Sequence, residues 1–313
     1  MIRDRIDTLT EEVGSGRTSD PGRALKSDFS GLSRLTHNLQ SLDAFQSSLA
    51  LAETWGQAAQ TSLGRIAEAS ARISASLPTN LASARSDGMR GAAAIARGAA
   101  EDIASALQTS VGGRAVFGNG EPGSPLSSIN SLLSDIASLA AGSADFDAYV
   151  ASVDAYFEPG GAYDTIQLTP VPATAVRFPV GGGETVSIDV DAGSSEIRNA
   201  LKQAALIAGL ENAGFDTTVA SHSDVSNELQ SRSSQVTSQL PVLQGVLGSA
   251  EARVALRSER NLADRQNIEM ALSDMMGIDP YEAVTKLQNE LSRLESLYAI
   301  TARRSQLRLT DYL

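Results

Sequence analysis

One stretch of the chain runs for about fifty residues without a proline, from Ser27 to about Leu77. Apolar residues recur along it three or four positions apart, which is the spacing of a single stripe on an α-helix. The stripe consists of Leu32, Leu35, Leu39, Leu42, Phe45, Leu49, Ala52, Leu63, Ile66, Ala69 and Ile73. A helix of this length with a narrow apolar stripe needs a helical partner to cover it.

The C-terminal third repeats this pattern. It predicts a long helix over 223–276, in which Pro241 could produce a kink. The segment Gly277-Ile278-Asp279-Pro280 ends that helix, and Asp279 can cap the next one because proline suits a first helical position. The last helix carries apolar residues in a pattern close to a heptad: Ala283, Leu287, Leu291, Leu294, Tyr298 and Thr301.

The middle of the chain has a different composition. Helices are expected over 2–13, 80–110 and 126–141, with a break at Leu77-Pro78-Thr79 and a loop or hairpin over 111–125. Between residues 156 and 190, prolines and glycines separate three short β-prone runs, 165–168, 174–178 and 185–190, and a helix follows at 195–207. This pattern indicates a small α/β insertion.

The two ends can bury their stripes most economically on each other. We therefore expect a mainly α protein: an elongated, antiparallel long-helix bundle or coiled coil, formed by the N- and C-terminal segments. The helical rod would comprise 1–144 and 216–313, and the inserted α/β domain 145–215. The candidate seam and assembly residues are Leu35, Leu39, Leu42, Leu49, Leu287, Leu291, Leu294 and Tyr298.

Composition excludes several classes of protein. Aromatic residues make up 4% of the chain, so its core must consist mainly of small aliphatic residues. The net charge of −12 argues against a nucleic-acid-binding surface, and the absence of cysteine excludes disulfides and thiolate chemistry. No apolar run approaches the length of a membrane helix, and the charged N-terminus does not resemble a cleavable signal peptide.

Residues suited to catalysis are few. The two histidines, His37 and His222, are expected on the surface; the run Ser221-His222-Ser223-Asp224 is too compact for a catalytic triad. Residues 118–123 fit the letters GxGxxG, but Glu121 would repel a pyrophosphate and Pro122 removes an amide donor, so a turn-rich loop is the better interpretation. We expect neither a metal site nor a cofactor, and no enzymatic activity.

Several segments carry a resemblance to a known family. Val13 to Ala24 looks like a Ser-Gly-Lys/Arg stretch followed by an Asp-Pro segment, and Ser48 to Thr54 is similar to the Ala/Glu-rich stretch after it. Gly113 to Gly118 resembles a Gly-x-x-x-Phe-x-Gly turn, and Gly277 to Ala283, with the leucine-spaced helix that ends at Leu313, is similar to a terminal helix. Together these segments resemble the bacterial flagellin family, and within it the hook–filament junction (hook-associated) proteins.

The resemblance implies a structural subunit that leaves the cell through the flagellar secretion channel and stacks its terminal helices in a tube. Its partners would be other flagellar subunits and an export chaperone, with neither nucleic acid binding nor membrane insertion. A junction subunit is the leading hypothesis, and a main-filament flagellin is close to it. A helical signalling or adhesion module, or an enzyme within the insertion, are the alternatives from other classes.

Overall fold

The computed structural model describes residues 2–20, 22, 29–81, 86–169, 175–214 and 222–310. The chain forms two compact units. Met1–Gln46 and Glu259–Leu313 make the terminal unit, and Ser47–Ser258 make the central unit. Long helices predominate over two small hairpins, so the expected mainly α, long-helix bundle with a small α/β part is confirmed. The predicted domain boundaries at 144/145 and 215/216 stay a proposal.

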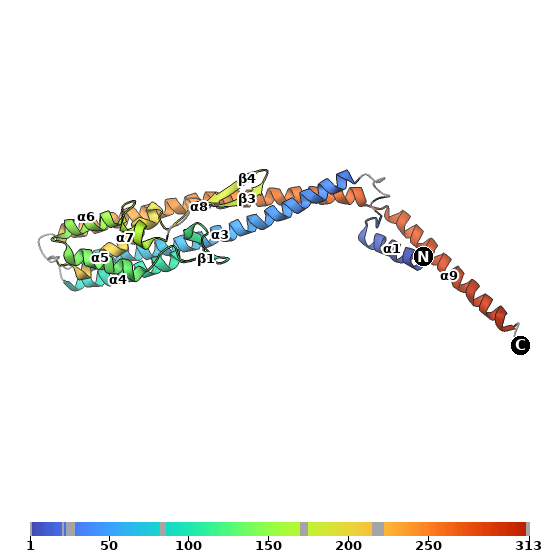
Figure 1. The fold of residues 1–313 in the computed structure, drawn as a ribbon, viewed down its shortest axis with the longest axis horizontal. Coiled ribbons are helices and arrows are strands. Elements are labelled where there is room, and N and C mark those ends of the chain that lie inside the picture. The colour runs from blue at the N-terminus through green and yellow to red at the C-terminus, as the bar shows by residue number, and fades with distance from the viewer. Residues whose placement is uncertain are drawn as a thin grey trace. The chain divides into compact units, whose positions relative to one another are not determined.

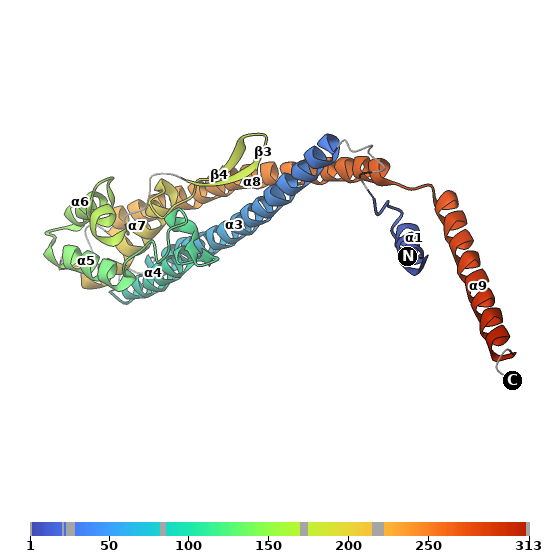
Figure 2. The same ribbon diagram turned by 45° about the vertical axis from the view of Figure 1, so that its right-hand side comes forward.

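The central unit is built on two long helices, α3 (Ser30–Leu81) and α8 (His222–Met276). Within this unit they lie side by side and run in opposite directions (Figure 1 and Figure 2). The hydroxyl of Ser74 on α3 contacts the hydroxyls of Ser233 and Thr237 on α8. Apolar residues of the two helices are almost completely buried: Leu63, Ile66, Ile73, Leu77, Leu229, Val236 and Leu240.

Among its described residues, the central unit has four further α-helices: α4 (Ser86–Leu107), α5 (Ile129–Gly142), α6 (Phe146–Phe157) and α7 (Ser195–Gly209). α7 packs against α4, α5 and α6, and most of its residues are buried. Alanines supply much of the α4 side of this contact, in line with the predicted small-aliphatic core. α5 and α6 each begin at a capping side chain, Ser128 and Asp145, which accept hydrogen bonds from the Ser131 and Ala148 amides.

Hairpins and short turns occur in the glycine- and proline-rich segments, where the sequence predicted breaks between helices. The segment 111–125 contains a hairpin of β1 (Ser110–Val111) and β2 (Arg114–Ala115), followed by the 3₁₀ turn η1 (Val116–Gly118). A second antiparallel hairpin pairs β3 (Val176–Gly181) with β4 (Glu184–Ile188) and is irregular near Pro179. Phe178 of β3 packs on Trp55 of α3, with ring centroids 6.2 Å apart. A 3₁₀ turn, η3 (Leu210–Asn212), follows α7.

Two sequence expectations are wrong. Pro78 does not separate two helices, because α3 continues through it to Leu81; packing of Leu77 and Ile73 in the core outweighs the loss of one helical hydrogen bond. Residues 165–168 do not form a strand. They belong mostly to η2, a π-helical turn over Tyr163–Gln167, which buries Tyr163 and Gln167. These two residues are four positions apart and lie on the buried side of the turn, while Thr165 and Ile166 between them are exposed.

The terminal unit contains α1 (Ile2–Ser15), residues 30–46 of α3, residues 259–276 of α8, and α9 (Pro280–Thr310). Here too α3 and α8 are paired. The Asn261 amide donates to the Leu42 carbonyl (3.0 Å) and to Gln46 Oε1 (2.9 Å), and Arg265 forms an ion pair with Asp43. Among the described residues, no helix is long and apolar enough to cross a membrane.

Pro241 offers a test of the cost of proline inside a long helix. It lies within α8, is exposed, and cannot donate an amide proton to the carbonyl of Thr237. We expect Pro241→Ala to raise the free energy of unfolding by about 2 kcal/mol, since the helix regains roughly 3 kcal/mol and the less restricted unfolded chain takes back roughly 1 kcal/mol; thermal melting would measure this. Pro280→Ala is the matched control. Proline at a first helical position costs nothing, so no gain is expected there.

Candidate assembly surfaces

The first candidate surface is built on the pairing of α1 with α9 in the terminal unit. Ile2, Ile6, Leu9 and Val13 form a half-buried stripe on α1, spaced four, three and four residues apart. α9 packs against α1 and runs in the opposite direction, since Arg5 contacts Glu290 while Arg3 contacts Tyr298 further along α9. Main-chain hydrogen bonds join the ends of this pair: Thr18 N donates to Met276 O (2.8 Å) and Ile278 N donates to Gly16 O (3.2 Å).

The start of α9 is set by its sequence. Asp279 Oδ1 accepts hydrogen bonds from the amides of Tyr281 (2.9 Å) and Glu282 (3.3 Å), and Pro280 is the first helical residue. The predicted cap and the predicted position of the proline are therefore both confirmed. The cap satisfies amides that have no partner within the helix and so determines where the apolar pattern of α9 begins.

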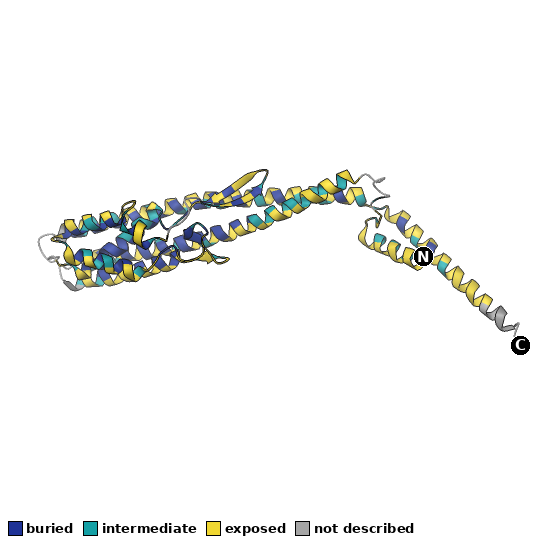
Figure 3. Ribbon diagram, viewed as in Figure 1, coloured by how far each residue is buried: buried dark blue, intermediate teal, exposed yellow. Residues whose placement is uncertain are grey.

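One face of α9 is covered by α1 and another is open. Ala283 and Glu290 are buried, and Leu287 and Leu294 are half-buried. Val284, Leu291 and Tyr298, which are seven residues apart, have 38%, 41% and 50% of their surface exposed, and most of α9 is exposed (Figure 3). A seven-residue spacing aligns side chains along one line of a helix, as in a coiled-coil seam. We call Val284, Leu291 and Tyr298 the open row; Arg3 of α1 contacts Tyr298 at its hydroxyl and ring but leaves half of the residue exposed.

Glu290 is a charged residue in an otherwise apolar contact. Its carboxylate lies 3.6 Å from Arg5 Nε and 3.4 Å from Arg293 Nη1, and its side chain is 11% exposed. A buried carboxylate requires such partners, since an unpaired one would be strongly unfavourable. The heptad interpretation of the sequence placed Leu291 on the seam, and it missed the role of Glu290 one residue earlier.

The other candidate seam residues lie on α3. Leu35, Leu39 and Leu42 are half-buried in the terminal unit, and Leu49 is 1% exposed in the central unit. Sequence analysis missed Asn261, which is buried opposite Leu42. A single polar residue in a coiled-coil seam fixes the register of the two helices. That Leu35, Leu39, Leu42, Leu49, Leu287, Leu291, Leu294 and Tyr298 serve assembly stays a proposal.

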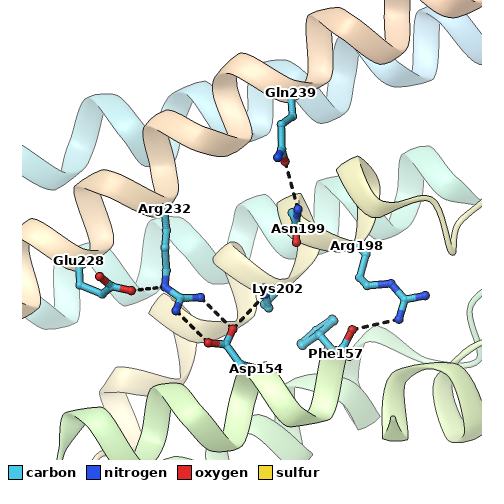
Figure 4. A network of polar contacts seen from close by, with 8 residues as sticks. All are labelled: Asp154, Phe157, Arg198, Asn199, Lys202, Glu228, Arg232 and Gln239. Atoms are coloured by element: carbon cyan, nitrogen blue, oxygen red, sulfur yellow. Dashed lines mark hydrogen bonds and ion pairs between the residues drawn. The ribbon is translucent and has the colours of Figure 1, made fainter. Parts of the chain in front are cut away.

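A second feature is a polar network in the central unit, where α6, α7 and α8 meet (Figure 4). Arg232 of α8 donates two hydrogen bonds of 2.8 Å to the carboxylate of Asp154 on α6, and its Nε donates to Glu228 at 2.7 Å. Lys202 of α7 lies 3.0 Å from Asp154.

Two more hydrogen bonds extend the network along α7. Asn199 donates to Gln239, which connects α7 with α8, and Arg198 donates to the carbonyl of Phe157 on α6. Only the Glu228–Arg232 pair, four residues apart on one helix, could be read from sequence spacing.

The electrostatics of this network depend on Asp154. Burial alone would raise the pKa of Asp154, but hydrogen bonds from Arg232 and Lys202 outweigh burial, and the pKa lies below its ordinary value. The hydrogen bonds that Arg232 donates to Asp154 and Glu228 raise the pKa of Arg232, against the effect of its own burial. Both groups are therefore held in their charged forms. Nearby, burial raises the pKa of Tyr149, whose hydroxyl donates to the Leu206 carbonyl at 2.7 Å.

The structure gives the positions of the histidine and of the glycine-rich loop that were weighed as catalytic or binding candidates. His37 is exposed, and the side chain of His222 lies outside the described residues. In the glycine-rich loop, the Gly120 and Glu121 amides bond to the carbonyls of Ala115 and Gly118, and Asn119 and Gly120 have positive φ. The loop is thus a closed turn in which the Gly120 and Glu121 amides already have acceptors. No group of three or more acidic or histidine side chains able to hold a metal ion occurs in the described ranges.

Comparison with known proteins gives one finding. Residues 229–313, which include most of α8 and all of α9, match the family model for the bacterial flagellin C-terminal helical region. Comparison with curated protein sequences gives no significant match. The match spans the Asp279 cap, the α9 side of its contact with α1, and the open row. The chain is therefore similar to bacterial flagellins over this C-terminal region.

Proposed function

We propose that the chain is a non-catalytic structural subunit of a bacterial flagellum, which assembles with its neighbours through its terminal helices. The supporting observation is the open row of α9, which lies inside the region similar to flagellins and exposes three apolar side chains at heptad spacing. A helix with such a row gains stability when another helix covers it. Its partners would be other flagellar subunits, and an export chaperone would hold it before assembly.

Within that role, we favour a subunit at the hook–filament junction over a subunit of the main filament. The argument rests on the junction-like Gly113–Gly118 turn, the Gly277–Ala283 segment and the small size of the β-containing part. A junction subunit would leave the cell through the flagellar secretion apparatus and act outside it. It would join two different tubes, so its surfaces must fit more than one kind of neighbour.

Imaging of a deletion strain separates the two roles. If the chain is a junction subunit, cells without it should carry hooks that lack filaments, and flagellin should appear in the medium. Hooks that still carry filaments would contradict the junction role. Loss of filament protein itself, with no secreted flagellin, would instead indicate the main-filament role. If the chain fractionated with the cytoplasm and never with sheared flagella, the flagellar proposal would fail as a whole.

The open row gives a direct test of assembly. Leu291→Asp places a charge on a side chain that is 41% exposed in the isolated chain. We therefore expect normal helicity by circular dichroism. If a neighbour covers Leu291, however, the buried charge should raise the concentration needed for polymerisation or co-assembly at least about tenfold. Sedimentation of assembled material measures this concentration.

Two variants calibrate that result. Gln288→Asp changes an exposed polar residue of α9 outside the open row, and assembly should be unaffected. Leu294→Asp changes a half-buried residue and should loosen the terminal unit, lowering helicity as well as assembly. Normal assembly of Leu291→Asp would show that the open row is not covered in the polymer.

A further inference from the structure

Asn119 and Gly120 form the only Asn-Gly dipeptide of the chain, at the turn that follows η1. Glycine has no side chain, so its main-chain nitrogen is unhindered when it follows an asparagine. In a flexible chain that nitrogen can attack the asparagine side chain, which makes this dipeptide prone to lose its amide. Asn119 is half-buried rather than enclosed, so solvent can reach the residue.

The reaction at such a dipeptide is a deamidation. The main-chain nitrogen of Gly120 forms a bond to Cγ of Asn119, the bond from Cγ to Nδ2 breaks, and the amide leaves as ammonia with the proton from Gly120 N. The product is a five-membered succinimide ring, which one water molecule opens at either carbonyl. The chain then carries aspartate or isoaspartate in place of asparagine, and it gains one negative charge.

The folded turn holds the two reacting groups apart. Asn119 has a φ of 49° and a ψ of 34°, and Gly120 has a φ of 79°, which are the angles of a type I′ turn. The Glu121 amide closes the turn on the Gly118 carbonyl at 3.0 Å. At this ψ, Gly120 N lies on the side of the Cα–C bond opposite to the Asn119 side chain. The ring can therefore close only after the peptide between the two residues turns over.

Two hydrogen bonds and close packing oppose that rotation. Gly120 N donates to the Ala115 carbonyl at 3.0 Å, and the Gly120 carbonyl accepts from Arg114 Nε at 2.6 Å. Gly120 is itself buried, and a carbon at its Cβ position would lie 3.1 Å from Val176 Cγ2 on β3. Turning the peptide over would break both hydrogen bonds inside a packed loop, so the reaction needs the loop to open first.

We propose that Asn119 is a deamidation site that the folded loop keeps unreactive and that reacts in unfolded chains. Since the reaction passes through the opened loop, its rate is the rate in the unfolded chain multiplied by the fraction of open loops. Isoaspartate would also lengthen the backbone by one carbon within a turn that depends on positive φ, so modified chains should refold less well. This proposal does not depend on the flagellar role.

Mass spectrometry of the full chain tests the proposal. The chain is incubated at mildly alkaline pH, either folded or denatured in guanidinium chloride, and the peptide that contains residue 119 is analysed for aspartate and isoaspartate. We expect the folded chain to react at least about a hundredfold more slowly than the denatured chain, since about 1% of loops or fewer are open. Similar rates in both states would overturn the proposal, and so would an Asn119 that stays intact in the denatured chain. Asn38, which is followed by leucine, is the internal reference and should react much more slowly than Asn119 in the denatured chain.

Arg114→Ala checks that opening of the loop governs the reaction. This variant removes the hydrogen bond to the Gly120 carbonyl and leaves the reacting dipeptide intact. It should raise the rate in the folded chain about tenfold with unchanged helicity, because one lost hydrogen bond changes the open fraction by about that factor. The rate in the denatured chain should stay the same. Arg253→Ala changes an exposed arginine of α8 and should alter neither rate. An unaltered folded rate for Arg114→Ala would contradict the proposed control by the loop.

Discussion

Gly209→Ala is expected to destabilise the central unit by about 3 kcal/mol, a large effect for one added methyl group. Gly209 ends α7, and its φ of −67° is one that alanine adopts freely, so backbone conformation is not the obstacle. A methyl group there would overlap the hydroxyl of Tyr149 and lie 2.9 Å from Ile136 Cγ2. Both neighbours are fully buried and cannot move aside.

The cost has a second part. Displacing Tyr149 would also break the hydrogen bond from its hydroxyl to the Leu206 carbonyl, deep in the core. Denaturant unfolding of the full chain measures the loss. Gly245→Ala is the matched control, because a methyl group at this position of α8 meets nothing within 4 Å. That variant should be more stable than the parent by about 0.5–1 kcal/mol, since alanine favours a helix over glycine. Equal effects of the two substitutions would show that the packing around Gly209 is not as described.

The second large effect is expected for Asp154→Asn. Asp154 is the common acceptor for Arg232 and Lys202, and its side chain is 30% exposed. Removing its charge leaves two partly buried cations with weaker partners. We expect a loss of about 2 kcal/mol at neutral pH, measured by denaturant unfolding. Asp147→Asn changes an exposed aspartate on the same helix and is the control. It should lower the free energy of unfolding by only about 0.5 kcal/mol.

The pH dependence provides an additional readout. Because the pKa of Asp154 is lower in the folded chain than in the unfolded chain, protonation of this group favours unfolding. Its contribution is complete above the ordinary aspartate pKa of about 3.9 and is lost as the pH falls through the lower folded value. The difference in stability between wild type and Asp154→Asn should therefore shrink below about pH 4. A difference that is constant from pH 7 to pH 3 would refute the proposed ionic role.

Much of the helical architecture follows from local sequence. The apolar stripes of α3, α8 and α9 repeat every three or four residues, and that period specifies a helix with one buried side wherever the chain is placed. Asp279 and Pro280 start α9 through contacts within a few residues. The glycine-rich turn after β2 depends on Asn119 and Gly120 adopting positive φ, which is also a local property. For this reason these elements were predictable.

Other features arise only when distant segments come together. Whether Pro78 would end α3 depended on the burial of Leu77 and Ile73, because the energy of tertiary packing exceeds that of one helical hydrogen bond. The Asp154–Arg232 pair joins residues 78 positions apart, and no local pattern specifies such a contact. The heptad pattern likewise could not reveal that α1 covers Leu294 more than Leu291.

The sequence by itself therefore determined which segments are helices, where several of them begin and end, and which side of each is apolar, since these depend on contacts within one or two turns. Only the tertiary structure decided which apolar side chains are covered and which polar groups are buried with partners. Burial is a property of the neighbours that a residue acquires in space, and spacing along the chain does not encode them.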